Sequence, residues 1–419
     1  MIQESQDRMV LEQRPSHGLE GSTSSYLRNL VEHFCVRDDL STYDPYDIWK
    51  TRLGLQVKCG YNSRPYLALA PAAALALVDN VLENRVRLFY QPKEYAVVRA
   101  MAALSLVNLY RSSGEHRLMA TALRHIRWLI ANSCSGFSGH CWGLGVTHAV
   151  SRDIVYDDNT PFSTITPYAL EAVIAFTKVS EEKSLQPVID SIFDFFDSDI
   201  KVMEEDNEVM ATSYGPFKDR TVINAVAYTM YAHSLLLPHV PRHRLSEIQT
   251  KIRKLYEYVR RQQRPDGSWF YSPYGRSFID CFHSCIVLKN IVKTHRLVGL
   301  PDASNTVAAG YEYLKKAFLN EQAFLFTRFA VKNKPGLVKF DLYDNAEVLS
   351  LSVLLGDTSL AMRLVDSIIA HFCRGFEVYS QIDYLGFRRK KNTLRWAVMP
   401  FLHAASLLLD KGTHLANQN

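Results

Sequence analysis

The sequence contains few of the residues that build a disulfide-rich or a membrane-spanning protein. Its seven cysteines are an odd number among 419 residues and include no Cys-x-x-Cys pair. Such usage argues against a disulfide framework and favours a reducing compartment. The longest apolar run, 66–78, contains Pro71 and falls short of the roughly 20 residues that span a bilayer. Because residues 1–17 also have no apolar stretch of the kind found in signal peptides, we expect a soluble, cytoplasmic protein.

Dense clusters of charge are also scarce. Lysine and arginine together number 48 and aspartate and glutamate 43, which gives a formal net charge of +5. Only RRKK at 388–391 is concentrated; a solvated loop explains it, with an anionic ligand or nucleic acid as the alternative. The rest of the chain has no basic stripe with interleaved aromatic residues, so we do not expect a nucleic-acid partner.

Alternation of apolar and polar residues with a period of two, which indicates half-buried strands, is almost missing. Instead, apolar residues recur at three-and-four spacing nearly throughout, which predicts an all-α protein. We expect residues 1–21 to form a flexible arm, 22–412 a single domain and 413–419 a tail. The predicted helices cover residues 24–35, 68–83, 94–113, 116–133, 163–179, 183–200, 221–236, 243–263, 278–294, 302–319, 341–355, 357–374 and 393–409.

Helices of two textures alternate along the chain. One set is apolar nearly all round, as expected of buried helices, and the other has an apolar stripe opposite charged residues. They form about six pairs if either 24–35 or 68–83 completes the last pair. No fixed-length repeat is visible, so we favour a closed α/α toroid, an (α/α)6 barrel, over an open solenoid. The nearly all-apolar helices are 94–113, 163–179, 221–236, 278–294, 341–355 and 393–409.

Long loops precede the buried helices, whereas the links that follow them are short. In a toroid the inner helices run parallel, so these loops meet at one end of the barrel. Long loops in compact domains are usually functional, which makes this end the predicted site. The long loops are 134–162, 201–220, 264–277, 320–340 and 375–392.

These loops and the first helical turns collect aromatic and polar side chains of the kinds that line sugar-binding clefts. Sugar rings stack on aromatics, and their hydroxyls need Asp, Asn, Arg and His partners. Taken singly, Trp142 and Trp396 fit a packing role better, and Asp157 and Asp158 fit a turn or N-cap. The residues in question are Trp142, His148, Tyr156, Asp157, Asp158, Tyr214, Arg220, Asn224, Trp269, Tyr271, Tyr274, Arg276, Asp280, His283, Tyr343, Asp344, Asn345, Glu347, Tyr384, Arg388, Arg395 and Trp396.

The stretch 261–291 places two ionisable groups at the start of a buried helix. Asp280 and His283 are three residues apart and share a helical face, either as a capping pair or as a catalytic pair. Glu347 lies four residues after Tyr343 on another buried helix. Burying a carboxylate costs free energy unless it has a partner, so an acid at this position indicates a pairing or a site role.

Two kinds of carbohydrate chemistry fit these residues, and the sequence leaves both open. Glycoside hydrolysis needs two carboxylates across a cleft, which Asp280 supplies together with Glu347, Asp344 or Asp157. A polysaccharide lyase or C5-epimerase needs a base, and a group that neutralises a uronate. The candidates for these two roles are Tyr271, His283, Arg276, Asn345 and Arg395.

A metal site is not expected. Asp280, Cys281 and His283 offer three ligand types within four residues. Consecutive helical positions point about 100° apart, however, so Asp280 and Cys281 do not easily face one ion. We therefore predict neither a metal nor another cofactor.

Several blocks, in order along 40–410, resemble the toroidal proteins encoded in bacterial exopolysaccharide, capsule and O-antigen clusters, members of the six-hairpin glycosidase-like group. The resemblance implies an α/α toroid that makes or modifies a surface polysaccharide, as an enzyme or as a glycan-binding scaffold. It also implies a saccharide ligand and other polysaccharide-assembly proteins as partners. The blocks are YDPYDIW (43–49), CWGLGV (141–146), NTPFSTITPYALEA (159–172), QRPDGSWFYSPYGRSFIDCFHSCIVLKNI (263–291), DLYDNAEVLSLSVLL (341–355) and LRWAVMPFLHAASLL (394–408).

A second resemblance is narrower. The stretch 262–269 is similar to the glutamine–tryptophan repeats of terpene cyclases and of protein prenyltransferase β-subunits, which share the toroid. It occurs once here, the cyclases' DxDD motif is absent, and the prenyltransferases' Asp-x-Cys spacing is replaced by adjacent Asp280 and Cys281. Terpenoid or prenyl chemistry is therefore the weaker alternative.

Overall fold

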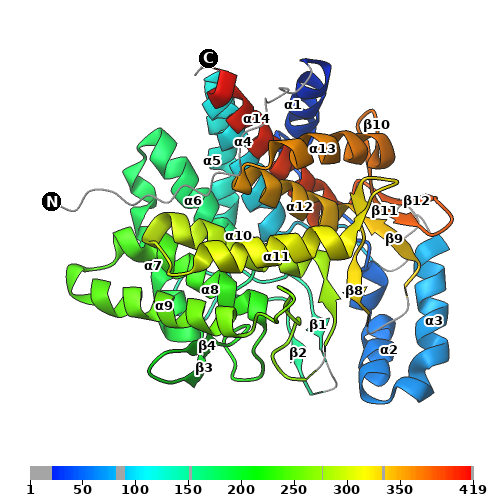
Figure 1. Ribbon diagram of the computed structural model, residues 1–419, viewed down its shortest axis with the longest axis horizontal. Coiled ribbons are helices and arrows are strands. Elements are labelled where there is room, and N and C mark those ends of the chain that lie inside the picture. Colours follow the sequence, from blue (N-terminus) through cyan, green and yellow to red (C-terminus); the bar gives the residue numbers. More distant parts are fainter. Residues whose placement is uncertain (1–20, 82–89, 151–152, 276, 333–335, 417–419) are drawn as a thin grey trace.

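The computed structural model of the protein describes residues 21–81, 90–150, 153–275, 277–332 and 336–416. Within these ranges, six helices form an inner ring and six more pack outside it (Figure 1). Each inner helix packs against the next, and the last packs against the first, so the ring is closed and the predicted α/α toroid is confirmed. The inner helices are α4 (Ala96–Ser113), α6 (Thr166–Ser180), α8 (Ile223–Leu236), α10 (Cys281–Val298), α12 (Leu342–Leu355) and α14 (Met399–Ala416).

The outer ring is completed by the first helix of the chain. This helix, α1, packs against both α14 and α4, so the segment predicted at 24–35 fills the sixth outer position. Residues 1–20 of the predicted arm and 417–419 of the predicted tail lie outside the described residues. The outer helices are α5 (His116–Ala131), α7 (Gln186–Asp194), α9 (Leu245–Arg261), α11 (Ala303–Phe318), α13 (Thr358–Phe372) and α1 (Gly21–Cys35).

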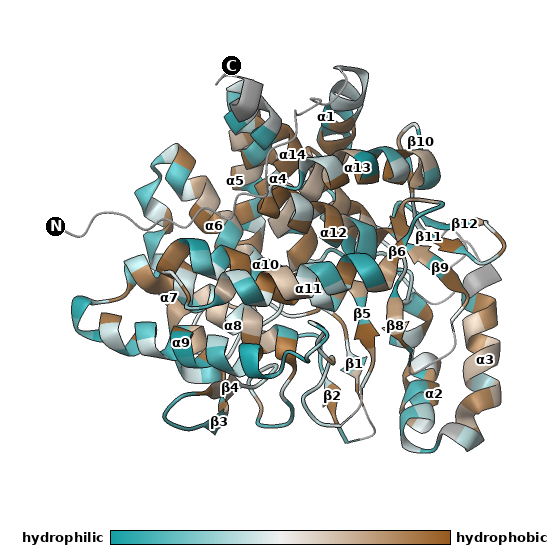
Figure 2. Ribbon diagram, in the orientation of Figure 1, coloured by the Kyte–Doolittle hydropathy of each residue, from teal (hydrophilic) through white to brown (hydrophobic). Residues whose placement is uncertain are grey.

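A further helical pair, α2 (Arg52–Ser63) and α3 (Pro65–Val81), stands outside both rings. The sequence predicted a single helix at 68–83 and missed α2, which begins where the Thr51 side chain accepts a hydrogen bond from the Gly54 amide. Figure 2 shows α3 as apolar along much of its length. It nevertheless packs mainly against α2, and it leaves Leu67 76% exposed.

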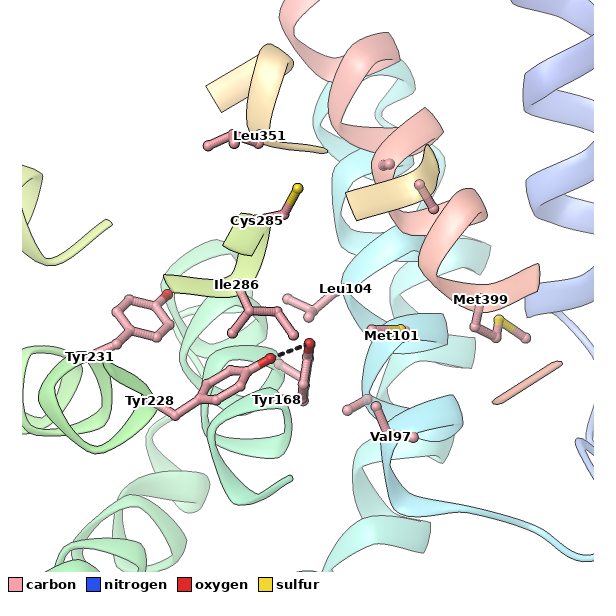
Figure 3. Close-up of a cluster of buried hydrophobic side chains, with 14 of the residues drawn as sticks. Val97, Met101, Leu104, Tyr168, Tyr228, Tyr231, Cys285, Ile286, Leu351 and Met399 are labelled. Carbon is pink, nitrogen blue, oxygen red and sulfur yellow. Dashed lines mark hydrogen bonds between the residues drawn. The ribbon is translucent and has the colours of Figure 1, made fainter. Parts of the chain in front are cut away.

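The two kinds of helix predicted from the sequence correspond to the two rings: the nearly all-apolar helices are the inner ones, and the helices with one apolar stripe are the outer ones. All 14 residues of α8 are buried, because an inner helix is surrounded by its ring neighbours, its outer partner and the core. The outer helix α9 buries only one stripe, including Ile248, Ile252 and Val259, and turns its charged residues outward. A cluster of apolar side chains between the inner helices fills the middle of the ring (Figure 3).

Some helix ends differ from the prediction. The helix expected at 183–200 is α7 flanked by a 3-10 turn, Lys183–Leu185, and a π-helical turn, Phe195–Asp199. The last inner helix begins after another π-helical turn, Leu394–Val398, and continues to Ala416, beyond the expected domain end at 412. The short links are as expected: Gly114 and Gly356 end α4 and α12 in the left-handed region, with φ of 71° and 79°.

Short strands occupy the long loops, where the sequence predicted none. Most form antiparallel pairs of two to four residues, and β9, β11 and β12 belong to one small sheet in which Gln381 is opposite Asp341. The cluster RRKK is strand β12, and its Lys390 is buried against Asp79, so it is not a purely solvated loop. The strands are β1 (His148–Ala149), β2 (Val155–Tyr156), β3 (Val202–Glu205), β4 (Met210–Thr212), β5 (Ile279–Asp280), β6 (Leu319–Asn320), β7 (Leu325–Phe326), β8 (Phe329–Val331), β9 (Val338–Asp341), β10 (Cys373–Arg374), β11 (Glu377–Asp383) and β12 (Arg388–Lys391).

The two ends of the ring differ. In Figure 1 the hairpins β1–β2 and β3–β4 and the pair α2–α3 lie on the lower side, whereas α1 lies on the upper side. Within the part of the chain that the structure describes, no helix combines the length and hydropathy that crossing a bilayer requires.

Candidate functional site

A cavity of about 1020 Å³ opens at the end of the ring where the inner helices begin. Every inner helix contributes to its lining, through its first turns or through the segment just before it. This confirms the predicted gathering of the long loops at one end. The volume is at the upper limit of ordinary small-molecule sites, about 300–1,000 Å³, and suits a ligand of several sugar units.

The bottom of the cavity is formed by the core of the ring. Tyr168 of α6 and Tyr228 of α8 share a hydrogen bond between their hydroxyls at 2.5 Å, and Val97, Met101 and Ile286 lie around them (Figure 3). One side wall comes from outside the ring, because α2 and α3 contribute lining residues along their length. Those of α3 are mostly apolar: Leu69, Ala72, Ala73, Ala76, Leu77 and Asp79.

Asp280 and His283 form a hydrogen-bonded pair on the cavity wall. Asp280 is the N-cap of α10, and its carboxylate accepts from the His283 amide at 3.2 Å. The same carboxylate lies 2.9 and 2.8 Å from His283 Nδ1, so it fixes the imidazole ring. Both residues line the cavity, and His283 Nε2 has no hydrogen-bond partner among the described residues. The capping role and the potential catalytic role therefore coexist in one aspartate.

Aromatic rings hold the imidazole in place. The ring centroids of Tyr271 and Phe282 lie 4.6 and 3.8 Å from that of His283, and Phe278 stacks on Tyr271 at 4.6 Å. Burial raises the pKa of the Tyr271 hydroxyl, so this side chain is a proton donor rather than a phenolate at neutral pH. An imidazole that is held in one orientation and partly shielded from water is suited to proton transfer.

Arg328 occupies an aromatic cage beside this pair. Its guanidinium donates to Asp341, the N-cap of α12, at 3.0 Å and to the Tyr46 hydroxyl at 2.8 Å. The Trp396 indole also donates to the Asp341 carboxylate, at 3.2 Å. Burial raises the pKa of Asp341, and Arg328 partly offsets that effect. The guanidinium carbon lies within 5.9 Å of four ring centroids, those of Tyr46, Phe282, Phe329 and Trp396.

A second ion cluster lies where the end of the ring meets its beginning. Asp44 pairs with Arg395 and, at 3.1 Å, with Lys50. Burial opposes the charge of Asp44, but the two cations outweigh it and hold the pKa of that carboxyl below its usual range. Both Lys50 and Arg395 line the cavity, whereas Asp44 is fully buried behind them.

Arg220 precedes α8 and Asn224 lies in its first turn, and both line the cavity. Arg220 stacks on the Tyr214 ring, with its guanidinium carbon 4.0 Å from the centroid. Burial opposes its charge, but neighbouring tyrosine hydroxyls, Tyr271 first, hold its pKa above the usual value. Asn224 also borders a water-sized void of about 10 Å³ beside Tyr271 and His283.

His148, on the opposite side of the cavity, is a neutral group. Its pKa is lowered to about 3, first by burial and then by nearby cations. Of the predicted site residues, the structure brings eleven to the cavity or to its wall. These are Asp280, His283, Tyr271, Tyr343, His148, Tyr214, Arg220, Asn224, Arg395 and Trp396, together with Trp269 on the edge of the small void.

Three predicted residues lie beneath the cavity rather than in it. Glu347 is buried in the ring, where Lys289 of α10 pairs with it at 2.6 Å. Asp344 accepts from the Phe282 amide at 3.0 Å and is fully buried. The Asn345 side chain accepts a hydrogen bond from the backbone amide of Phe326 and donates one to its backbone carbonyl. None of the three lines the cavity, which corrects the expectation that they meet the ligand.

Other predicted residues point elsewhere. The Trp142 and Trp269 indoles are buried and donate to the carbonyls of Leu129 and Val259, so both anchor loops to outer helices. Asp157 accepts from the Thr160 hydroxyl in a turn, as the turn interpretation predicted. Outside the cavity lining lie Trp142, Asp157, Asp158 and Tyr274, while Arg276 lies outside the described residues.

Sequence reasoning missed several residues that shape the cavity, because no motif marks them. Arg328 follows a two-residue strand, and Lys50 belongs to YDPYDIWK, which carried only the family resemblance. Tyr46 and Trp49 come from the same segment and line the same cavity. Among the described residues, no three His, Cys, Asp or Glu side chains are grouped so as to hold a metal ion.

No protein-family model matches the chain, and no curated protein sequence matches it. Solved structures do share its fold. A D-mannose isomerase has a TM-score of 0.63 at 9% identity, over 95% of this chain and 100% of that chain. The cellobiose 2-epimerase of Bacillus thermoamylovorans B4167 has a TM-score of 0.61 at 9% identity, over 94% and 100%.

A possible member of the GH105 family from Salmonella enterica subsp. enterica serovar Paratyphi A str. ATCC 9150 is similar over the full length of both chains. Its TM-score is 0.59 at 11% identity, with 100% of each chain covered. At such identities the likeness establishes the fold alone, and that fold is the six-hairpin glycosidase-like α/α toroid.

Proposed function

We propose that this protein is a carbohydrate-active enzyme that modifies a bacterial surface polysaccharide, or its precursor, by acid–base chemistry at His283. The observation that carries the proposal is the Asp280–His283 pair. Asp280 holds Nδ1 of a histidine that lines the cavity, and Nε2 has no hydrogen-bond partner among the described residues. A histidine oriented in this way removes or delivers a proton in many enzymes.

The walls of the cavity support a sugar ligand. Tyr46, Trp49, Phe282, Tyr343 and Trp396 offer ring faces and edges on which sugar C–H groups stack. Arginine, asparagine and histidine side chains among them supply partners for hydroxyls. Two structures of the same fold are, by name, a sugar epimerase and a sugar isomerase, which agrees with this ligand class.

The small number of carboxylates in the described lining favours proton transfer at carbon over glycoside hydrolysis. Glycoside hydrolysis by two acids requires carboxyl groups on both sides of the scissile bond. Among the described lining residues the only carboxylates are Asp280 and Asp79, and Asp79 is paired with Lys390. Glu347, the best sequence candidate for a second acid, is buried with Lys289. An epimerase or a lyase, which needs one base and no second acid of this kind, fits better.

The test is solvent isotope exchange. The protein is incubated in D2O with the surface polysaccharide, or oligosaccharide units, of its source organism. Deuterium at ring carbons, new ends and unsaturated uronate are then measured by mass spectrometry and NMR. We expect deuterium or unsaturation, and a loss of roughly 10²–10⁴-fold in rate for His283→Ala, the usual range for a general base.

The matched control is Tyr274→Ala, because Tyr274 is 64% exposed and lies outside the cavity lining. This variant should retain full activity. A non-catalytic glycan-binding toroid is the alternative, since aromatic walls bind sugars with or without chemistry. If His283→Ala restored polymer production in cells as well as the wild-type protein did, the enzymatic proposal would be wrong and the binding role would stand.

A further inference from the structure

The lining of the cavity is strongly cationic, although the whole protein carries a formal net charge of only +5. Six basic side chains reach the cavity, against two carboxylates. Cations that share a low-dielectric recess add their potentials and attract anions into it. The cations are Lys50, Lys58, Arg220, Arg328, Lys332 and Arg395, and the carboxylates are Asp79 and Asp280.

Three of these cations already have a carboxylate partner, and Arg220 has none among the described residues. Arg328 is paired with Asp341, and Lys50 and Arg395 share Asp44. Among the described residues, no carboxylate oxygen lies within 4.0 Å of the Arg220 guanidinium nitrogens. The group stacks on Tyr214 and leaves Nε without a hydrogen-bond partner. A stacked guanidinium keeps its donor edge free for a carboxylate or a phosphate.

The segment around Arg220 contains other unsatisfied polar atoms. Thr221 Oγ1 and Asn224 Oδ1 have no hydrogen-bond partner among the described residues, although these residues are only 1% and 5% exposed. Buried polar groups in proteins are nearly always paired, and an unpaired group needs an explanation. A ligand in the cavity supplies one for Asn224, which lines the cavity, whereas Thr221 does not.

The cations of the lining lower the pKa of another residue of the cavity, His148. The charged groups that lower the pKa of His148 most are cations. His148 and Arg220 line the same cavity, so the cations give this part of it a positive potential. The groups acting on His148 are Lys58, Arg220, Arg395 and Lys50.

Arg220 also lies close to the proposed catalytic histidine. Tyr271 connects the two: its hydroxyl is next to the Arg220 guanidinium, and its ring lies 4.6 Å from that of His283. An anionic group bound at Arg220 therefore lies in the same cavity as His283, beside the tyrosine that contacts the imidazole.

We infer that the cavity takes a saccharide with a negative charge, a carboxylate or a phosphate, and that Arg220 binds this anionic group beside His283. The inference rests on the proposed function in that it places a sugar in this cavity. It adds the charge of that sugar and the residue that recognises it.

For a uronate the placement has a chemical consequence. When the C–H bond next to the carboxylate breaks, the proton goes to His283 Nε2 and the electron pair moves into the carboxylate, where Arg220 stabilises it. The carbon then takes a proton from water on its other face, which gives the epimer, and His283 returns its own proton to the hydroxide that remains. Alternatively, the neighbouring C–O bond breaks, the alkoxide leaves with the proton that His283 took up, and an unsaturated uronate remains. A phosphate at Arg220 serves binding only.

The test is calorimetric titration of the full chain with three probes of similar size: glucuronate, glucose 1-phosphate and glucose. We expect at least one charged probe to bind about tenfold more tightly than glucose, since one charge-assisted hydrogen-bonded pair accounts for that ratio. The better of the two charged probes tells a carboxylate site from a phosphate site. The preference should weaken between about 0.1 and about 1 M salt, whereas glucose binding should not change.

Arg220→Gln should abolish the preference for the charged probe, and Arg220→Lys should retain part of it. The matched control is Lys218→Gln, which removes an exposed cation from the same segment. Equal affinities for all three probes, no binding of either charged probe, or an unchanged preference in a folded Arg220→Gln protein would each overturn the inference. His283→Ala separates the two proposals: it should still bind the anion, even if no substrate is turned over by the wild type.

Discussion

At the scale of single residues, Asp344 shows how the ring sets the protonation of a carboxyl group. Burial raises the pKa of Asp344 well above its usual 3.8, so the folded protein keeps a proton that the unfolded chain loses. Between these two pKa values the folded state binds more protons, and its stability falls as pH rises, by at most about 1.4 kcal/mol per pH unit. Asp344→Asn removes this dependence. Its melting temperature relative to the wild type should therefore increase as the pH rises above 3.8.

The control for this prediction is Asp158→Asn, because Asp158 is exposed in the fold. The difference between this variant and the wild type should not vary with pH over the same range. A constant difference for Asp344→Asn as well would show that the carboxyl group is ionised in the folded protein. Differential scanning calorimetry in matched buffers measures both variants.

Single residues also show what the sequence can and cannot predict. The pairing of Asp280 with His283 was predictable, because both residues lie on one turn of one helix. Trp142 and Trp396 looked alike in sequence, because each taken singly fitted a packing role. Trp142 donates to the Leu129 carbonyl inside the fold, whereas Trp396 donates to Asp341 on the cavity wall. That difference depends on tertiary neighbours, which no local pattern encodes.

At the scale of elements, Gly310 determines how closely α11 approaches α10. A Cβ added at Gly310 would lie 2.7 Å from Leu288 Cδ2 and 2.8 Å from the Trp269 ring. The Trp269 indole is tied to the Val259 carbonyl at 2.9 Å and has little freedom to move. Gly310→Ala should lower stability by about 1–3 kcal/mol through overpacking, although glycine-to-alanine in a helix normally gains up to about 1 kcal/mol. The urea midpoint of unfolding is the measurement.

Gly60→Ala in α2 is the matched control for that helix contact. Its added Cβ would meet only the Ala68 Cβ, at an ordinary 3.5 Å. The helix-propensity gain is then unopposed, and the midpoint should stay constant or rise. A midpoint that stayed constant or rose for Gly310→Ala too would mean that Trp269 moves aside and does not fix the spacing of the two helices.

At the scale of the whole molecule, the alternation of buried and surface helices, together with the lack of a fixed-length repeat, favoured the toroid over an open solenoid. The composition of the cavity was not predictable in the same way. Asp44 and Arg395 are 351 residues apart and meet only because α14 closes against α4. Arg328 enters from an irregular loop whose path depends on the small sheet around it. Sequence patterns located the end of the ring at which the site forms, and ring closure selected most of its charged residues.

Ring closure also gives α1 a structural role that its position near the N-terminus conceals. Phe34 is fully buried, and the neighbouring Cys35 contacts Met399 of α14, so α1 covers the point where the last inner helix meets the first. Phe34→Ala should therefore cost about 3–5 kcal/mol, the usual loss for a large core side chain. Leu67→Ala in α3, the rival candidate for this position, should change stability by no more than about 0.5 kcal/mol, since Leu67 is 76% exposed. Urea unfolding of the two variants compares them directly, and equal losses would mean that α3 contributes to the closure of the ring as much as α1 does.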